Sequence, residues 1–144
     1  MDQVIHDTIS TSPLFKHLSA TLVQYLGDRS KLVEFGDGDV IIEEGTSVAS
    51  LYLLSDGVVR VWTNSMNREV ELKKLGAGTY FGEVSLLSGK EATATVEVLQ
   101  APVKVVAVDR EAVMELIKQD ERVRKMLEGV TLARAKDTIS KVLK

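Results

Sequence analysis

The sequence predicts a mainly β fold flanked by helices, and two changes in the spacing of apolar residues carry this prediction. Apolar residues recur at helical spacing up to about residue 30, alternate with a period near two over residues 31–109, and return to helical spacing from residue 110. Glycine-containing turn signals separate the short β segments at regular intervals. Many short strands joined in this way are typical of an antiparallel sandwich or a closed barrel.

Two short helices are expected before the first strand. The first begins near Val4 and is bounded by Pro13, because the residue before a proline disfavours the helical conformation. Ser19 is a favourable N-cap for a second helix over residues 20–26, and Gly27 follows its last turn.

Seven β segments are expected in the middle of the chain, separated by turn signals such as Asp56-Gly57. The segments are Lys31–Phe35, Val40–Glu44, Ser50–Leu54, Val58–Trp62, Glu69–Leu75, Thr93–Leu99 and Val103–Val108.

Two further helices are expected at the C-terminal end. Asp109 can cap one that continues through Ile117, and Asp120 can cap a longer one from Glu121 to about Val142. The longer helix has two apolar faces, which favours packing first on its own domain and then on a second surface. One irregular core helix with a frayed end remains the alternative. The first face holds Val123, Met126, Leu127, Val130 and Ala133, and the second holds Leu132, Ala135, Ile139, Val142 and Leu143.

Length and composition narrow the class of protein. The chain has 144 residues, 44% of them hydrophobic and 27% charged, so we expect one domain over residues 1–144 with a packed core. The net charge of −3 argues against a nucleic-acid binder that relies on overall positive charge. No apolar run approaches the roughly 18 residues of a membrane span, and no signal peptide begins the chain, so a cytoplasmic location is expected.

Catalytic and metal-binding motifs are missing from the sequence. The chain has no cysteine, which excludes disulfides, thiolate metal sites and cysteine nucleophiles. Its two histidines, His6 and His17, have no partner at metal-ligand spacing except Asp7. No serine nucleophile elbow and no P-loop lysine is present. We therefore expect no enzymatic activity, no cofactor and no metal.

The segment over residues 80–96 carries the clearest sign of a binding site. It lies between two expected strands and contains a short helical turn opened by Gly82 and Glu83. A glycine there lets the backbone approach a ligand closely, and the isolated carboxylate of Glu83 can accept hydrogen bonds from ligand hydroxyls. A plain loop-and-turn crossing, with Glu83 capping the turn, is the competing interpretation.

This segment resembles the phosphate-binding cassette of cyclic nucleotide-binding domains, whose pattern F-G-E-x-(A/S)-L-L-x-x-x-P-R-x-A-T-V aligns with residues 81–96 without a gap. The resemblance extends over about residues 14–143. Further matching stretches are Gly38-Asp39-Val40-Ile41, Glu44-Gly45, Ser50-Leu51-Tyr52-Leu53-Leu54, Gly57 and Val59-Arg60-Val61. It implies an eight-stranded antiparallel jelly-roll barrel (a double-stranded β-helix) over residues 31–109. Helical regions at residues 1–30 and 110–144 would flank this barrel.

The resemblance also assigns site residues. It places Glu83 on the ribose 2′-hydroxyl and the Gly82 amide near the ligand, with Phe81 just before them. Val84 and Ser85 fall at the start of the cassette helix, where main-chain amides meet the cyclic phosphate. Thr93 matches a small hydroxyl position near a phosphate oxygen, and Thr138 falls where some bacterial relatives contact adenine. The implied ligand-binding residues are therefore Phe81, Gly82, Glu83, Val84, Ser85, Ala92, Thr93 and Thr138.

One departure from the family pattern concerns the phosphate. The family's Pro-Arg is Glu91-Ala92 in this sequence, so the guanidinium that pairs with the cyclic phosphate is missing and a like charge is added. Lys90 and Arg60 are the two cations that could replace this guanidinium. However, we expect Lys90 to lie in a turn that faces water and Arg60 to lie on the polar face of the barrel. The sequence therefore predicts a retained fold with altered or weakened phosphate recognition.

Two classes of function remain open from these observations. The first is a regulatory sensor that binds cyclic AMP, cyclic GMP or a related purine ligand, which the retained Gly82 and Glu83 favour. The second is a degenerate domain that binds no nucleotide and acts by dimerisation or by docking to a protein effector, which Ala92 and the second apolar helix face favour. In either case we expect a homodimer through Leu132, Ala135, Ile139 and Val142 of the C-terminal helix, without DNA or membrane binding.

Overall fold

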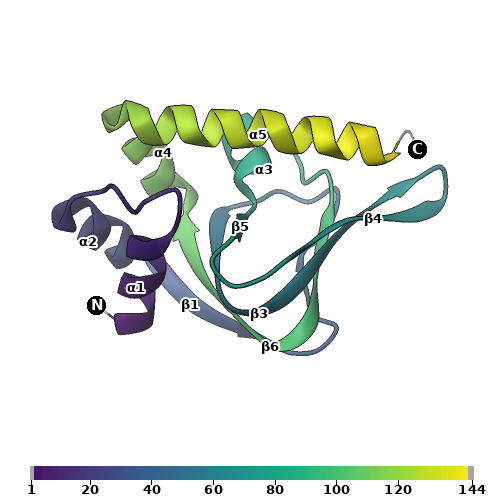
Figure 1. Cartoon of the computed structure of the whole chain (residues 1–144), viewed down its shortest axis with the longest axis horizontal. Coiled ribbons are helices and arrows are strands. Elements are labelled where there is room, and N and C mark those ends of the chain that lie inside the picture. Colours follow the sequence, from purple (N-terminus) through teal and green to yellow (C-terminus); the bar gives the residue numbers. More distant parts are fainter. Residues whose placement is uncertain (1, 143–144) are drawn as a thin grey trace.

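The computed structural model describes residues 2–142, apart from the side chains of Val130, Thr131, Ala135, Asp137 and Thr138. Two helices precede a β-sheet, one short helix interrupts it, and two helices follow it (Figure 1). The helices are α1 (Gln3–Thr11), α2 (Ala20–Asp28), α3 (Glu83–Ser88), α4 (Arg110–Gln119) and α5 (Glu121–Val142). The strands are β1 (Ser30–Phe35), β2 (Val40–Ile42), β3 (Ser50–Ser65), β4 (Arg68–Leu75), β5 (Tyr80–Phe81) and β6 (Thr95–Asp109).

The strands form one antiparallel sheet. Its central path runs β1-β6-β3-β4, with β2 paired to β6 and β5 paired to β3. The expected fold class, mainly antiparallel β with helices at both ends, is therefore confirmed. Among the described residues, no helix combines the length and the apolar character needed to cross a membrane.

Two of the expected boundaries between β segments lie instead within long strands. β3 continues through Asp56-Gly57, where its register against β6 shifts and the strand bends. Gly57 has a φ of +87°, and a Cβ atom there would overlap the carbonyl oxygen of Pro102 on β6, so glycine is required. β6 likewise joins the segments expected at Thr93–Leu99 and Val103–Val108. The short strand β5 was not expected, and the expected count of eight strands is not confirmed.

The expected helix starts are confirmed, with one difference in the capping. Ser19 caps α2 by accepting the amide of Leu22 at 3.3 Å, and Asp120 accepts the amide of Arg122 at 2.9 Å at the start of α5. Asp109 is the N-cap residue of α4, but its side chain makes no capping hydrogen bond. Gly27 lies inside α2 and does not follow it.

Two hydrophobic clusters lie on opposite sides of the sheet, and β3 and β6 contribute to both. Leu53 and Val106 pack with the flanking helices, whereas their neighbours Leu54 and Val105 pack inside the barrel. Successive side chains of a strand point to opposite faces, so each long strand supplies both clusters. The helical cluster also contains Ile9, Phe15, Leu26, Val113, Leu116 and Leu127, and the barrel cluster also contains Val59, Leu72, Phe81, Ala92, Val96 and Val103.

Helix α5 runs across the open end of the barrel, over α3 and toward β4 (Figure 1). Val123 and Leu127 of its first face are buried, while Leu132 and Ile139 of its second face are each 58% exposed. Val142 was expected on the second face with them, but it packs against the barrel cluster.

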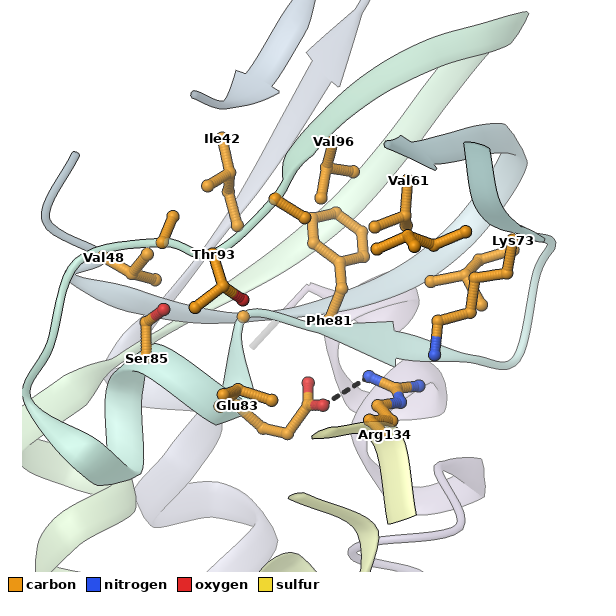
Figure 2. A pocket seen from close by; sticks show the side chains of 16 residues that line it. Ile42, Val48, Val61, Lys73, Phe81, Glu83, Ser85, Thr93, Val96 and Arg134 are labelled. Atoms are coloured by element: carbon orange, nitrogen blue, oxygen red, sulfur yellow. Dashed lines mark hydrogen bonds and ion pairs between the residues drawn. The ribbon is translucent and has the colours of Figure 1, made fainter. Parts of the chain in front are cut away.

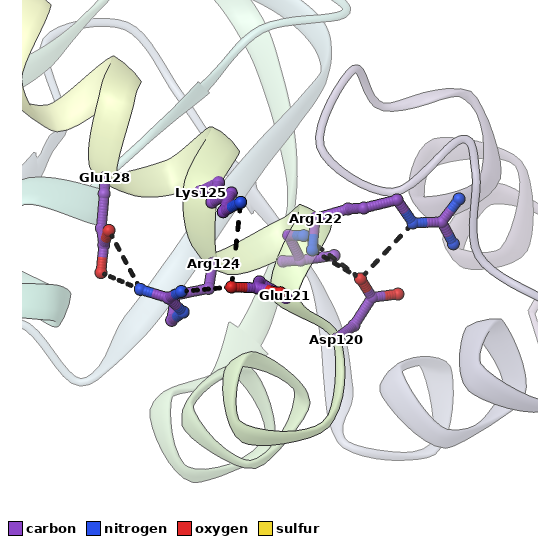
Figure 3. A network of polar contacts seen from close by, with 7 residues as sticks. Asp120, Glu121, Arg122, Arg124, Lys125 and Glu128 are labelled. Carbon is purple, nitrogen blue, oxygen red and sulfur yellow. Dashed lines mark hydrogen bonds and ion pairs between the residues drawn. The ribbon is translucent and has the colours of Figure 1, made fainter.

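The start of α5 carries a network of surface ion pairs (Figure 3). Arg124 lies 2.9 Å from Glu121 and 3.3 Å from Glu128, and Lys125 lies 3.8 Å from Glu121. Such exposed pairs at i,i+3 and i,i+4 contribute only tenths of a kcal/mol each.

Candidate ligand-binding pocket

A pocket opens between the barrel interior, α3 and α5. Seven of the predicted ligand-binding residues line it together: Phe81, Gly82, Glu83, Val84, Ser85, Ala92 and Thr93. The other lining residues are Ile42, Val48, Val61, Leu72, Lys73, Leu75, Ala94, Val96 and Arg134.

Gly82 makes the sharp passage from β5 into α3. It is the N-cap of α3 with a φ of +91°, a conformation that favours glycine. A Cβ atom there would lie 3.1 Å from the backbone oxygen of Ser50 and 3.3 Å from the ring of Tyr52, so a side chain would be both strained and crowded. This turn directs the next residue, Glu83, into the pocket.

Glu83 forms an ion pair with Arg134 of α5 inside the pocket (Figure 2). The Glu83 side chain is 1% exposed, and its Oε1 atom lies 2.5 Å from Nη1 of Arg134. Its other oxygen, Oε2, is buried and has no hydrogen-bond partner in the described part of the chain. A buried carboxylate oxygen without a donor is costly, so this atom is suited to accept a hydrogen bond from a ligand.

Tyr80 and Arg134 are stacked beside this ion pair. The guanidinium carbon of Arg134 lies 4.7 Å from the centroid of the Tyr80 ring. Burial raises the pKa of Tyr80 above its ordinary value, with Arg134 opposing and Glu83 reinforcing the shift. Arg134 is thus fixed between a ring and a carboxylate.

Among the residues that the structure describes, the cassette side of the pocket has hydroxyl groups but no positive charge. Ala92 is 6% exposed and forms part of the apolar wall. Glu91 is exposed and does not line the pocket, and its carbonyl accepts the Ser85 hydroxyl at 3.3 Å. The hydroxyl groups of Ser85 and Thr93 are the polar side chains at this end.

The two cations considered as replacements for the family arginine lie outside the pocket, on the faces where they were expected. Lys90 is exposed and is not a lining residue. Arg60 lies on the outer face of the sheet, 2.7 Å from Glu69 and 2.9 Å from Glu97. Its hydrogen bond to Glu69, reinforced by Glu97, raises its pKa above the ordinary value.

The sequence analysis did not assign the charged lining residues Lys73 and Arg134 to the site. Arg134 lies two helical turns after Leu127, on the buried face of α5, and that spacing was available as a signal. Nothing in the sequence distinguishes Lys73 from Lys74, its neighbour on β4. Thr138 lies on α5, but its side chain is outside the described residues, so its assignment stays a prediction.

Comparison with known proteins identifies the family. The cyclic nucleotide-binding domain family matches residues 32–120. The chain belongs to this family. The match covers the barrel from Leu32 of β1 onward, the cassette and α4, and it ends just before α5 begins.

Relatives of this domain occur in longer proteins. The Drosophila melanogaster cGMP-dependent protein kinase, isozyme 1, is 35% identical over 108 residues, which are 73% of this chain and 14% of the kinase. The Mus musculus potassium/sodium hyperpolarization-activated cyclic nucleotide-gated channel 2 is 38% identical over 88 residues, which are 61% of this chain and 10% of the channel. The chain therefore spans a small fraction of the length of these relatives.

Solved structures agree on the fold. The Thermus thermophilus catabolite activator protein superposes with a TM-score of 0.77 at 27% sequence identity, covering 91% of this chain and 62% of that protein. The regulatory domain of Toxoplasma gondii PKA, solved with cAMP, superposes with a TM-score of 0.79 at 21% identity. It covers 90% of this chain and 49% of that structure. The jelly-roll architecture of this family is thereby confirmed.

Proposed function

We propose that residues 1–144 form a single non-catalytic sensor domain that binds a cyclic nucleotide or a related purine ligand in this pocket. The observation that carries the proposal concerns Glu83, a lining residue of the pocket, whose Oε2 atom is buried and has no donor among the described residues. Family membership supports the ligand class, since the relatives include a cGMP-dependent kinase and a PKA regulatory domain solved with cAMP.

In this proposal Glu83 accepts a ribose hydroxyl through Oε2. The backbone at Gly82, Val84 and Ser85 then faces the cyclic phosphate, and the hydroxyl of Thr93 lies at the same end. Phe81 and Ala92 supply apolar wall, and the base extends toward α5, where Thr138 is the assigned contact. A ligand that fills this space also covers the apolar side chains of the barrel interior.

Phosphate recognition is weakened in this proposal because Ala92 supplies no charge. The family arginine would make a charge-assisted contact in a shielded site, worth on the order of 1.5–3 kcal/mol. Glu91, being exposed, contributes repulsion screened by solvent. The pocket should therefore distinguish poorly between a cyclic nucleotide and the corresponding nucleoside.

The test is calorimetric titration of wild type, Ala92→Arg and Glu83→Gln with cyclic AMP, cyclic GMP, adenosine and guanosine. Ala92→Arg should tighten the binding of the preferred cyclic nucleotide by roughly ten- to a hundredfold. It should leave nucleoside binding unchanged, since a nucleoside has no phosphate. Glu83→Gln should weaken both kinds of ligand.

Two results would contradict this proposal. Wild-type binding of none of the four ligands would refute the sensor function. Tight wild-type binding of a cyclic nucleotide that Ala92→Arg leaves unchanged would refute the weakened phosphate site.

The exposed second face of α5 favours an additional role in assembly. Leu132 and Ile139 of α5 are largely solvent-exposed. We propose that a second copy of the chain covers them in a homodimer, and that the dimer presents the sensor to a protein effector in the cytoplasm, without DNA or membrane binding. Dimerisation without nucleotide binding is the outcome that would favour the degenerate alternative.

A further inference from the structure

A second cavity adjoins the cassette end of the ligand-binding pocket, since Val48 and Ser85 line both. Its other lining residues in the described part of the chain are Ser47, Ala49, Gly89, Lys90 and Arg110. Two cations and two serines therefore line this cavity, and no carboxylate is among its described lining residues. This local excess of positive charge contrasts with the net charge of −3 of the whole chain.

The first cation, Arg110, is anchored at one nitrogen and has donors left over. It is the half-buried first residue of α4, and its Nε atom donates to the backbone carbonyl of Leu86 at 3.2 Å. Its Nη2 atom lies beside Gly89, 3.8 Å from the position that a Cβ atom would take there. Its Nη1 and Nη2 groups have no hydrogen-bond or ion-pair partner among the described residues. A guanidinium fixed in this way presents a planar pair of donors, which matches the oxygens of a phosphate.

The second cation, Lys90, is exposed and follows the turn that ends α3. Gly89 makes this turn with a φ of +72°, which a residue with a side chain rarely adopts. The carboxylates next to the two cations in the sequence are Glu91, Asp109 and Glu111. None of these three lines the cavity, and none forms an ion pair with either cation in the described part of the chain. Two like charges at one cavity repel each other, so a bound anion would stabilise this arrangement.

We propose that this second cavity binds a phosphate group through Arg110 and Lys90. One source of that group is a linear purine nucleotide in the ligand-binding pocket, and this source rests on the proposed function. If Glu83 holds the ribose, a 5′-triphosphate chain continues beyond the place of a cyclic phosphate, past Ser85 and toward the two cations. The other source is a separate phosphate compound, which needs no nucleotide in the first pocket.

The test is calorimetric titration of the full chain with inorganic tripolyphosphate, adenosine, guanosine, ATP and GTP, without divalent cations. The variants are Arg110→Met, Lys90→Met and the control Lys118→Met, which removes an exposed cation of α4 that does not line the cavity. Arg110→Met should weaken the binding of phosphate-bearing probes about tenfold, and Lys90→Met about threefold because its ammonium is exposed.

Lys118→Met should change the binding of no probe, and none of the variants should change the binding of the nucleosides, which carry no phosphate. Thermal unfolding checks that each variant folds. Lys90→Glu, which reverses a charge at an exposed position, provides the same test if Arg110→Met does not fold.

The probes distinguish the two sources of phosphate. A triphosphate that binds more tightly than its nucleoside, with the gain lost in Arg110→Met, would assign the cavity to the phosphates of a bound nucleotide. Tripolyphosphate binding that Arg110→Met weakens and that nucleosides do not displace would assign it to a separate phosphate compound.

The proposal would be overturned if no phosphate-bearing probe binds, or if Arg110→Met and Lys90→Met bind these probes as Lys118→Met does. Nucleoside binding in that case would leave the sensor function standing. Conversely, tripolyphosphate binding that depends on Arg110, without binding of any nucleoside or cyclic nucleotide, would support the phosphate site and refute the sensor function alone.

Discussion

The two halves of α5 contact the rest of the molecule in different ways. Before Gly129, the helix is held by apolar burial, since Val123 is 4% and Leu127 0% exposed. After Gly129, polar contacts join the helix to the barrel, since Arg134 pairs with Glu83 and Lys141 donates to a backbone carbonyl of β4, and Val142 adds an apolar contact near the helix end. Gly129 itself is exposed, and an added Cβ would meet no atom within 4 Å.

The two halves of α5 therefore have different roles: the first half stabilises the fold, and the second half contacts the proposed ligand site. Apolar burial in the first half contributes to the free energy of unfolding whatever the pocket contains. The ion pair in the second half joins α5 to Glu83, the residue proposed to hold the ligand. A ligand that engages Glu83 therefore acts directly on the second half of α5 and only indirectly on the first.

The largest expected effect comes from the buried anchor in the first half. Leu127→Ala should lower the free energy of unfolding by about 2–5 kcal/mol, because it leaves a cavity in the helical cluster. Leu132→Ala, on the exposed face, should change the free energy of unfolding of the monomer by no more than about 0.5 kcal/mol. Urea denaturation of both variants measures the difference, and equal costs would mean that both halves are packed alike.

A smaller effect is expected from the ion pair in the second half. Arg134→Met should lower the free energy of unfolding by about 1–3 kcal/mol, because it leaves the Glu83 carboxylate buried without its partner. Glu83→Gln should also destabilise the fold. The double variant should cost less than the sum of the two single variants, as measured in a double-mutant cycle by urea denaturation. Additive costs would show that the pair does not hold α5 to the barrel.

The smallest effect on folding is expected at the exposed face, where the consequence is assembly. Ile139→Asp should change the free energy of unfolding of the monomer by less than about 0.5 kcal/mol. It should nevertheless shift the protein from dimer to monomer in light scattering, because a charge would then enter an apolar contact. A wild-type monomer at high concentration would contradict the dimer, and Lys136→Asp on the same helix serves as a charge control.

The sequence predicted the helices and the cassette better than it predicted the strands. Ser19 and Asp120 mark helix starts through local hydrogen bonds, so a local pattern is sufficient to find them. Asp56-Gly57 has the local pattern of a turn, but pairing with β6 carries β3 through it. That outcome depends on a strand distant in the sequence, and local reasoning could not show it.

The same limit applies to the candidate site. Residues 81–85, together with Ala92 and Thr93, line one pocket, and they could be named from the sequence because they belong to one contiguous motif. Arg134 and Lys73 come from α5 and β4, and only the tertiary arrangement brings them beside Glu83. The missing charge at Ala92 was visible in the sequence, whereas the charges at the other end of the pocket were not.

The long pairing of β3 with β6 also bears on how the chain folds. These strands are far apart in the sequence, since Ser50 pairs with Asp109 and Trp62 pairs with Thr95. The chain between them must therefore become compact before the two strands can form their hydrogen bonds. Closing such distant contacts costs chain entropy that nearby contacts do not, and it slows folding. Helices α4 and α5 are adjacent in the sequence and contact each other. They are therefore expected to form before the sheet is complete. The rate-limiting event of folding should then be the closure of the barrel that builds the pocket.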